Sequence, residues 1–537
     1  MKFLPVSLDA LLVELDDLAQ SQALWAALQA APPRGVTQIV PAARTLLLDF
    51  DAAATSFEAL AAAVAAVRPA SGSRPAGALV EIPVRYDGED LAEVAQLLGI
   101  TPEEVVRRHT GSEYSVAFTG FAPGFAYLSG GHPSFDLPRR KSPRTRIPPG
   151  AVALAGRFSG VYPRMSPGGW QLIGITDTPM WDLARERPAL LQPGQRVRFV
   201  DVTALPGAAS NAAASPQAPS SAPDPGDTTL KTHFLFEVRR PGPQALIQDL
   251  GRRGQAGQGV SVSGALDRAA LRAANRLVGN AADAAALEIA YGGFELACHG
   301  DAVVAVTGAE APLELVDAQG RALPTRRYGA LALSPGDLLR VGEPVAGMRS
   351  YLAVRGGFDV APVLGSRASD TLASIGPRPL AAGDRLAALP VAGAAVVGAD
   401  ETPPAALPHA GAEVVLDVVM GPRTDWFDAA SVARFCAQAW RVTPQSNRVG
   451  IRLQADTPLE RVPALLKAEL PSEGTIAGAL QVPPNGQPVL FLADHPVTGG
   501  YPVIACVAPY HLDLAGQIPI GASVRFRVIR DFHVIES

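Results

Sequence analysis

The feature that most constrains the fold is a sequence pattern that occurs twice, a Gly-Gly-aromatic turn followed later by Val-Arg-Phe. Residues 167–170 read Pro-Gly-Gly-Trp, and residues 197–199 then read Val-Arg-Phe. Residues 498–501 read Thr-Gly-Gly-Tyr, and residues 524–526 again read Val-Arg-Phe. Glycine pairs favour tight turns, and alternating apolar residues are typical of a strand. The repeat therefore predicts two related, β-rich halves.

Between these halves lies a stretch that is unsuited to folding. Residues 203–230 consist almost wholly of Ala, Ser, Pro, Asp, Gly and Thr, which offer too little apolar surface for a core. The 537 residues are 48% hydrophobic and 18% charged, so several separate cores are expected. We predict a mainly β protein with α+β parts, built as two tethered halves. The expected domains are a small α+β domain (1–75), a β-barrel (76–202), a linker (203–231), a β-rich domain (232–400) and a second β-barrel (401–537).

Charge and cysteine content exclude several classes of protein. A net charge of −5 gives no general attraction to nucleic acid or to anionic membranes. The longest apolar run near the N-terminus, residues 59–67, is far shorter than the ~20 residues of a membrane span. Three scattered cysteines suit a reducing compartment and lack the spacing of a disulfide framework or a zinc cluster. The sequence thus predicts a cytoplasmic protein with no metal site, no nucleic-acid partner and no membrane partner.

Local start signals and apolar spacing predict six helices among many short strands. Thr101, Pro102 and Glu104 form the pattern of an N-cap with a capping box, which predicts a helix from residue 102 to about residue 109. The other predicted helices cover residues 18–30, 57–67, 90–98, 268–277 and 429–437. This pattern excludes a regular βαβ array, and with it a Rossmann or TIM-barrel fold.

Familiar catalytic motifs are missing from the sequence. It contains no P-loop, no G-x-S-x-G elbow, no H-E-x-x-H helix and no Met-Lys-Met biotinylation site. Any nucleotide or carboxylated cofactor must therefore bind in an unfamiliar way or come from another protein.

Two loops of the first half carry groups suited to ligand binding. Residues 120–128 combine glycines and a proline with aromatic rings, which predicts either a stacking surface for a flat ligand or a packed turn. Residues 138–146 hold five cations between prolines, and such a loop either grips phosphate or carboxylate or is simply solvated. The candidate binding residues here are Phe121, Pro123, Gly124, Phe125, Arg139, Arg140, Arg144, Arg146, Ser166, Gly168, Gly169 and Trp170.

The second half supplies most candidates for acid–base chemistry. Asp494 and His495 are the nearest approach to a general-base pair, although neighbours on a strand point to opposite faces and His495 can equally be structural. Asp267 either belongs to an anion site in a Gly-rich loop or is the N-cap of the next helix. The candidate catalytic residues are Asp494, His495, Glu473 and His109. The candidate binding residues are Asp249, Ser263, Asp267, Arg448, Arg452, Gln481, Thr498, Gly499, Gly500 and Tyr501.

Longer strings of residues resemble two known families of proteins. Residues 109–114, 120–128, 138–146 and 166–174 resemble the family called allophanate hydrolase subunit 1, KipI or the B subunit of 5-oxoprolinase. Residues 248–251, 263–267, 274–280, 446–450, 478–483 and 498–505 resemble KipA, or the C subunit of 5-oxoprolinase. Ala122 and Val449 depart conservatively from the family pattern. The resemblance implies a cyclophilin-like β-barrel at the end of each half and a link to the carboxyltransferase region of urea carboxylase.

The resemblance implies three alternative functions. The first is the B–C component of an ATP-dependent 5-oxoprolinase, an amide hydrolase that opens 5-oxo-L-proline to L-glutamate through a phosphorylated lactam. It implies ATP with Mg²⁺ as cofactor and, as partner, the separate LamB/YcsF-like A subunit of 5-oxoprolinase. The second is a biotin-dependent carboxyltransferase with a urea- or amide-like acceptor, and biotin is expected only there. The third is a Kip-type module that regulates a kinase. Since candidate loops come from both halves, we expect the site to lie between them.

Overall fold

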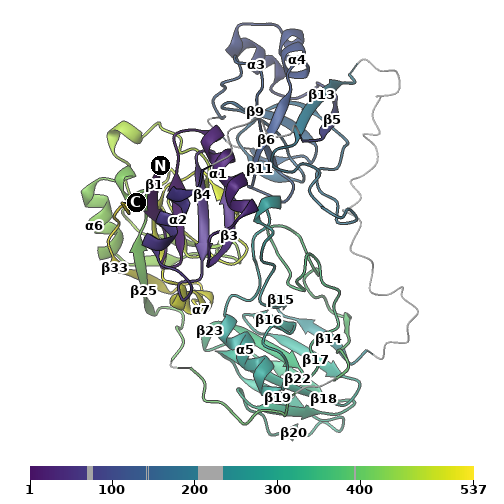
Figure 1. Ribbon diagram of the computed structural model, residues 1–537. Helices are drawn as coiled ribbons and strands as arrows, with labels where there is room; N and C mark the ends of the chain where they lie inside the picture. Colours follow the sequence, from purple (N-terminus) through teal and green to yellow (C-terminus); the bar gives the residue numbers. More distant parts are fainter. Residues whose placement is uncertain are drawn as a thin grey trace.

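The computed structural model describes residues 1–68, 77–140, 142, 144–203, 234–391, 395–404 and 406–536 (Figure 1). From residue 204 to residue 231, the predicted linker lies outside the described residues. The described chain is mainly β, and each half contains a barrel-like sheet, which confirms the predicted fold class. Among the described helices, none combines the length and the apolar character needed to cross a membrane.

The chain begins with an N-terminal module, residues 1–68, in which two helices cover one face of a four-stranded sheet (Figure 1). The strands are antiparallel in the order β1-β2-β4-β3. Asp17 and Ser56 cap the helices by accepting hydrogen bonds from backbone amides. The elements are β1 (Lys2–Pro5), β2 (Ala10–Glu14), α1 (Leu18–Ala30), β3 (Val36–Pro41), β4 (Thr45–Phe50) and α2 (Phe57–Ala66).

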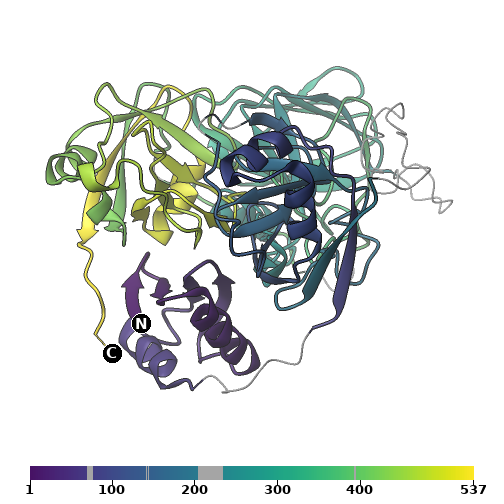
Figure 2. The same cartoon turned by 90° about the horizontal axis from the view of Figure 1, so that it is seen from above.

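The other face of this sheet packs against the last barrel of the chain. Leu12 and Leu47 share one apolar cluster with Val497 of that barrel. Ile535, near the C-terminus, pairs with Phe3 of β1, and its amide donates to the Phe3 carbonyl at 2.9 Å. The two ends of the chain therefore lie together (Figure 2), and the N-terminal module is anchored on the second half.

Residues 77–203 form the first barrel, a seven-stranded sheet in the order β12-β9-β10-β7-β6-β13-β5. An isolated bridge between Arg85 and Ile175 joins the two edges of the sheet. The N-cap predicted at Thr101 is confirmed, because its Oγ1 accepts a hydrogen bond from the Glu104 amide. The elements are β5 (Leu79–Val84), α3 (Leu91–Leu98), α4 (Pro102–Thr110), β6 (Tyr114–Thr119), β7 (Ala126–Ser129), β8 (Arg144–Ile147), β9 (Ala151–Ala155), β10 (Phe158–Val161), β11 (Ser166–Gly168), β12 (Gln171–Ile175) and β13 (Arg196–Asp201).

The second half begins with a two-sheet domain, residues 234–391. A six-stranded sheet (β20-β19-β22-β17-β14-β24) and a five-stranded sheet (β15-β16-β23-β18-β21) enclose an apolar core. The helix predicted over 268–277 is confirmed, and Asp267 caps it by accepting from the Ala270 amide at 2.8 Å. The elements are β14 (Phe236–Pro241), β15 (Gln244–Gln248), η1 (Ala256–Gln258), α5 (Arg268–Leu277), β16 (Ala286–Ala290), β17 (Phe294–Cys298), β18 (Ala302–Glu310), β19 (Leu313–Val316), β20 (Ala322–Leu323), β21 (Ala330–Leu333), β22 (Leu338–Val341), β23 (Ala346–Val354) and β24 (Arg385–Leu386).

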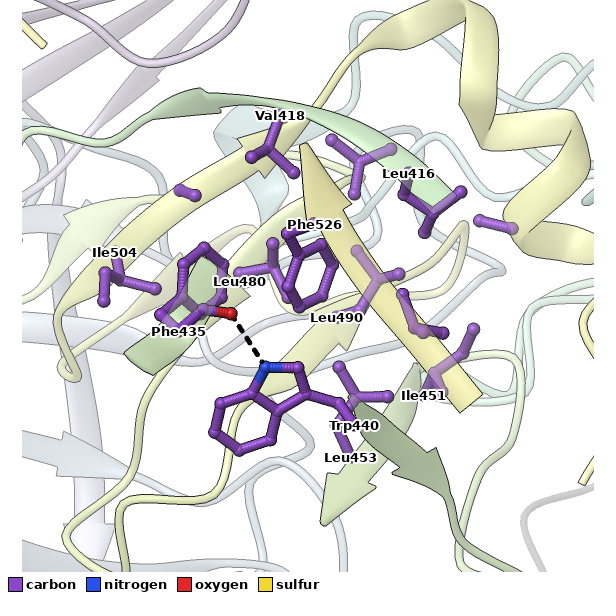
Figure 3. Packing of buried hydrophobic residues seen from close by; sticks show 14 of the residues in the cluster. Leu416, Val418, Phe435, Trp440, Ile451, Leu453, Leu480, Leu490, Ile504 and Phe526 are labelled. Atoms are coloured by element: carbon purple, nitrogen blue, oxygen red, sulfur yellow. Dashed lines mark hydrogen bonds between the residues drawn. The ribbon is translucent and has the colours of Figure 1, made fainter. Parts of the chain in front are cut away.

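The last barrel is closed, in the order β25-β32-β29-β30-β27-β26-β33. Apolar side chains fill its interior (Figure 3), where Trp440 Nε1 donates a hydrogen bond to the Phe435 carbonyl at 3.0 Å. A filled interior places ligand sites at the rims of the barrel or against its neighbours. The elements are β25 (Glu413–Met420), η2 (Thr424–Trp426), α6 (Ala429–Ala437), β26 (Trp440–Val442), β27 (Gly450–Gln454), η3 (Pro463–Leu465), β28 (Glu473–Gly474), β29 (Ala479–Gln481), β30 (Val489–Phe491), β31 (Thr498–Gly499), β32 (Val503–Val507), η4 (Pro509–His511), α7 (Leu512–Gly516) and β33 (Ser523–Arg530).

The two barrels have the same topology, strand for strand. In each, the final strand runs parallel to the first strand and antiparallel to the second. In each, two further strands pair outside the barrel as a ribbon, β8 with β11 in the first and β28 with β31 in the last. Each Gly-Gly-aromatic sequence lies at the end of this ribbon. The repeat predicted from the sequence is therefore confirmed as a duplicated barrel.

Candidate functional site

Loops of the two halves meet in a region that we call the inter-half junction. The first half contributes residues 119–125 and 162–164, and the second half contributes residues 249–264, 366–376 and 494–498. The short teal turn of η1, between β15 and α5, lies against the first barrel (Figure 1). The junction therefore joins segments that are far apart in the sequence.

Hydrogen bonds and close packing tie the junction together. Thr119 Oγ1 donates to the Gly257 carbonyl at 2.8 Å, and the Phe121 amide donates to Thr498 Oγ1 at 3.2 Å. A Cβ at Gly120 would overlap the Thr498 side chain, so this approach requires glycine. The aromatic loop of the first half and the Thr-Gly-Gly-Tyr loop of the second half are thus in direct contact.

Three non-glycine residues of the junction have left-handed backbone conformations. The φ angles are 64° at Phe121, 56° at Ser263 and 53° at Ser374. A positive φ costs about 1–3 kcal/mol for a residue with a Cβ, and such strain is concentrated at functional sites. Three of the six non-glycine residues with positive φ in the described part of the chain thus lie at the junction, which makes it a candidate site.

Asp370 is a buried carboxyl group at the junction. Its Oδ1 accepts a hydrogen bond from the Ala373 amide at 2.7 Å, and its Oδ2 accepts one from Ser261 Oγ at 3.1 Å. Burial, followed by the neighbouring charge of Asp494, raises the pKa of Asp370 to about 6. A carboxyl group with this pKa exchanges protons near neutral pH, as a general acid or base must.

Two arginines, one from each half, lie near this carboxyl group. Arg252 Nη1 is 3.9 Å from Asp370 Oδ2, and Arg252 Nε and Nη1 have no hydrogen-bond partner among the described residues although the residue is 1% exposed. Arg164 Nη1 donates to Ser374 Oγ at 3.4 Å. Burial lowers the pKa of Arg164, and the charge of Asp370 opposes that shift. A buried cation with unpartnered N–H groups, as Arg252 is among the described residues, is rare and suits an anionic ligand such as phosphate or carboxylate.

Asp494, the predicted general base, is fully buried in an ion network. Arg448 Nε and Nη2 donate to its two oxygens at 3.0 and 3.1 Å, and Ser263 Oγ donates at 2.6 Å. Arg448 also donates to Glu288 of the two-sheet domain. Burial acts to raise the pKa of Asp494, but Arg448 and the hydrogen bonds outweigh burial and leave this pKa below its ordinary value. Asp494 thus joins the two-sheet domain to the last barrel, and a catalytic role for it stays a prediction.

The two histidines predicted for the site are buried as well. His109 lies between Tyr86 Oη at 2.7 Å and Ser159 Oγ at 3.0 Å inside the first barrel, and burial lowers its pKa to about 3. His495 Nδ1 contacts the Pro496 carbonyl at 2.9 Å, and burial lowers its pKa too. Both rings are therefore mainly neutral near pH 7, and their contacts suit structural roles. Their catalytic assignment stays a prediction.

Glu473, the remaining predicted catalytic residue, lies in a pocket of about 130 Å³ between the N-terminal module and the last barrel. Arg423 Nε donates to Glu473 Oε2 at 3.1 Å, and Arg423 Nη2 donates to Glu14 Oε1 at 2.9 Å. Burial raises the pKa of Glu473, while Arg423 opposes this shift. The three charges form an ion network across the boundary between the two halves.

The predicted aromatic loop is a packed turn. Phe125 is buried, with ring centroids 5.3 Å from Tyr162 and 5.4 Å from Trp170 in edge-to-face contacts. Phe121 contacts Phe125 at 5.2 Å and is only half-buried. Of the two predicted alternatives, packing describes Phe125, whereas Phe121 remains partly exposed at the junction.

The arginines of the arginine-rich loop differ in how closely they already pair with a carboxylate of the protein. Arg140 Nη1 and Arg144 Nη2 donate to Asp90 Oδ1 at 2.6 and 2.7 Å. Arg139 faces the second half, with its Nε 3.5 Å from Glu469 Oε2. Two of the predicted anion-binding arginines are therefore already bound to a carboxylate of their own barrel.

The other predicted binding residues lie in loops and ribbons around these groups. Asp249 Oδ1 accepts hydrogen bonds from the Gly251 amide at 2.7 Å and from Ser366 Oγ at 2.6 Å. Gln481 Nε2 donates to the Tyr501 carbonyl at 3.1 Å. Residues with little or partial exposure are Pro123, Gly124, Ser166, Gly168, Gly169, Asp267, Gly499 and Gly500, whereas Arg146 and Arg452 are exposed.

The sequence predictions omit Asp370, Arg252 and Arg164. A signal for Asp370 is the dense run of hydroxyl and charged residues over 365–371, next to glycine, which is typical of functional loops. Its hydrogen-bond partner Ser261 is more than a hundred positions away. Residue patterns do not reveal contacts over that separation, so the cluster is visible only in the folded chain.

Comparison with known families covers both halves. The family model described as carboxyltransferase domain, subdomain A and B, matches residues 258–528. The model described as carboxyltransferase domain, subdomain C and D, matches residues 1–191. The matched ranges contain the junction segments 119–125, 162–164, 366–376 and 494–498, and they include residues 258–264 of the segment 249–264.

Similar curated proteins divide between the two halves. The C subunit of 5-oxoprolinase from Escherichia coli is 38% identical over 300 residues, which cover 54% of this chain and 90% of that protein. The B subunit of 5-oxoprolinase from Bacillus subtilis is 48% identical over 128 residues, 23% of this chain and 53% of that protein. The urea amidolyase of Lachancea kluyveri is 33% identical over 312 residues, 54% of this chain and 17% of that protein.

A solved structure resembles nearly the whole chain. The crystal structure of TTHA0988 is 36% identical, has a TM-score of 0.80, and the match covers 96% of this chain and 99% of that chain. The arrangement of both halves is therefore shared with a protein of known structure.

We predict that the Arg448 network holds the second half together. Arg448→Met leaves the buried charges of Asp494 and Glu288 without their shared cation and should lower the free energy of unfolding by about 3–5 kcal/mol. Arg452→Met, on an exposed side chain of the same barrel, should change it by less than about 0.5 kcal/mol. Urea denaturation measures both values. Equal effects of the two substitutions would contradict the structural role of the network.

Proposed function

We propose a function for this chain from the premise that it belongs to the carboxyltransferase-domain family, as a fusion of the B and C types of 5-oxoprolinase subunits. The proposed function is that of the B–C component of an ATP-dependent 5-oxoprolinase, which opens 5-oxo-L-proline to L-glutamate. The proposal includes a separate LamB/YcsF-like protein, the A component of the enzyme, and a cytoplasmic location. The observation that supports this proposal most strongly is that one chain contains both a region similar to the B subunit and a region similar to the C subunit.

The chemistry explains the need for ATP. An unstrained lactam is a poor electrophile. Transfer of the terminal phosphoryl group of ATP to the lactam oxygen activates the ring carbon, so that water adds to it and the C–N bond breaks as the nitrogen takes up a proton. A second water molecule then hydrolyses the resulting acyl phosphate to glutamate and phosphate. Arg252 and Arg164 are the residues that we propose to hold the phosphate charge, because Arg252 has buried N–H groups without a partner among the described residues. Guanidinium groups that are fixed before the reaction stabilise charge as it develops.

Asp370 is our proposed acid–base group for this reaction. Its pKa of about 6 leaves it mostly ionised near pH 7, so it can accept a proton from an attacking water molecule. Ser261 and the Ala373 amide hold the carboxylate in place. Asp494, already paired with Arg448, raises the pKa of Asp370 through its negative charge.

A second candidate is a biotin-dependent carboxyltransferase component with a urea- or amide-like acceptor. It is favoured by the match to carboxyltransferase subdomains and by the similarity to urea amidolyase. Under this alternative, biotin would be supplied by another protein. Arg252 Nη2 donates to the Ala368 carbonyl, and its Nε and Nη1, which have no partner among the described residues, would face a carboxylate in place of a phosphate.

Phosphate release from ATP tests the proposed function. We expect the chain mixed with the LamB/YcsF-like protein to release phosphate faster when 5-oxoproline is added, and to form glutamate in proportion. Parallel assays omit the LamB/YcsF-like protein, omit 5-oxoproline, or replace it with urea. Phosphate release that does not change when 5-oxoproline is added to any mixture contradicts the proposal. Consumption of carboxybiotin, supplied in a separate assay with urea, supports the second candidate.

The pKa of Asp370 predicts a specific pH dependence. A general base loses activity when it is protonated, so the rate should fall as the pH drops below about 6. Asp370→Asn should lower the rate by about 10²–10⁴-fold and abolish this acid limb. Asp283→Asn, an exposed aspartate of the same domain, is the control. An unchanged rate and acid limb in a folded Asp370→Asn protein would rule out this role.

A further inference from the structure

The pocket between the N-terminal module and the last barrel has features of a binding site. It measures about 130 Å³, room for at least about four water molecules of about 30 Å³ each. The module contributes Glu14, Arg44 and Thr45, and Glu14 pairs with Thr45 across β2 and β4. The barrel contributes Arg423, Trp426, Leu470, Pro471, Ser472 and Glu473. The pocket thus suits a molecule of about the size of a small amino acid.

The charged side chains that line this pocket differ in how many hydrogen bonds they already make within the protein. Arg423 donates to Glu473 at 3.1 Å and to Glu14 at 2.9 Å, so most of its guanidinium group is committed. Arg44 approaches Glu14 only to 3.6 Å, and its side chain is 49% exposed. Arg44 is therefore the cation with N–H groups left for a ligand. A carboxylate is the anion whose two oxygens match the guanidinium fork.

Thr45 gives an independent indication of a ligand. The residue is 2% exposed and lines the pocket, yet its Oγ1 has no hydrogen-bond partner among the described residues. An unpaired buried hydroxyl costs about 1–3 kcal/mol, and most buried polar side-chain atoms are paired. A ligand that hydrogen-bonds to Thr45 removes this cost.

The duplicated barrel offers an internal comparison. In the first barrel, the ribbon residue Arg144 binds Asp90 in the loop after the first strand. In the last barrel, the ribbon residue Glu473 binds Arg423 in the equivalent loop, so the ion pair has the same place and exchanged charges. Asp90 is saturated, because it also binds Arg140 and accepts from a backbone amide. The pair in the last barrel instead borders an open pocket.

We propose that this pocket binds a compact molecule with a carboxylate next to an N–H group, that is, an α-amino acid or a lactam formed from one. The carboxylate binds Arg44 and the Thr45 hydroxyl, and the N–H group donates to Glu14 or Glu473. The selection of 5-oxoproline and glutamate as first ligands rests on the proposed function, whereas the ligand class rests on the pocket itself. Because the pocket is lined by both halves, the bound ligand bridges them.

Isothermal titration calorimetry on the full chain, without ATP or a partner protein, tests this site. The probes are 5-oxoproline, glutamate, 2-pyrrolidinone, which lacks the carboxylate, and cyclopentanecarboxylate, which lacks the N–H group. We expect 5-oxoproline or glutamate to bind, and both truncated molecules to bind at least about tenfold more weakly than the better of the two. The first two probes distinguish a lactam site from an amino-acid site.

Three variants locate the binding. Arg44→Gln removes the charge from a half-exposed side chain and should weaken binding by about 10- to 100-fold. Thr45→Val should weaken binding by about 5- to 10-fold without lowering the melting temperature of the ligand-free protein, because the lost hydroxyl has no partner among the described residues. Arg34→Gln, exposed on the same module, is the matched control and should bind like the unaltered chain.

Several results would overturn the site. These are no binding of 5-oxoproline or glutamate at millimolar concentration, unchanged affinity in both Arg44→Gln and Thr45→Val, or tight binding of 2-pyrrolidinone. Turnover separates this inference from the proposed function. Unchanged 5-oxoproline affinity in Arg44→Gln and Thr45→Val, with normal stimulated phosphate release, overturns the pocket alone, and ligand binding without any stimulated release overturns the proposed function alone.

Discussion

One buried arginine links the domains of the second half and sets the electrostatics of the junction. Arg448 donates hydrogen bonds to Asp494 of its own barrel, to Glu288 of the two-sheet domain and to the Gly264 carbonyl. Buried charges are tolerated because they are paired and hydrogen-bonded. The charge that Arg448 preserves on Asp494 is also one cause of the raised pKa of Asp370. The ion network that joins the domains and the candidate acid–base group thus belong to one electrostatic system.

Duplication gives the two halves the same barrel and different surroundings. In the first barrel, the ion pair beside the ribbon is closed by further hydrogen bonds to Asp90. In the last barrel, the equivalent pair of Arg423 and Glu473 meets Glu14 of the N-terminal module at the edge of a pocket. The module belongs to the first half in sequence but packs on the second half in space, as Figure 2 shows. The N-terminal module of the first half therefore forms one wall of a pocket whose other wall belongs to the second half.

Local signals in the sequence predict local structure well. The Gly-Gly-aromatic repeat marks equivalent ribbons of two barrels, and the N-caps at Thr101 and Asp267 form as their residue types predict. The candidate site is less predictable, because its chemistry depends on contacts between distant segments. In the sequence, Asp494 and His495 are candidates for a carboxylate–histidine general base. In the folded chain, however, Asp494 is bound by Arg448. Asp370 gains its unusual pKa only from burial and from a neighbour more than a hundred positions away.

We propose one functional site that the two halves share, and cleavage of the chain between residues 204 and 233 tests this arrangement most directly. A protease site introduced there allows the folded chain to be cut, the fragments to be separated, and 5-oxoproline-stimulated phosphate release to be measured with the LamB/YcsF-like protein. The shared site predicts that neither fragment supports this activity, and that mixing the fragments restores it. Full activity of the isolated first half, or of the isolated second half, would contradict a shared site.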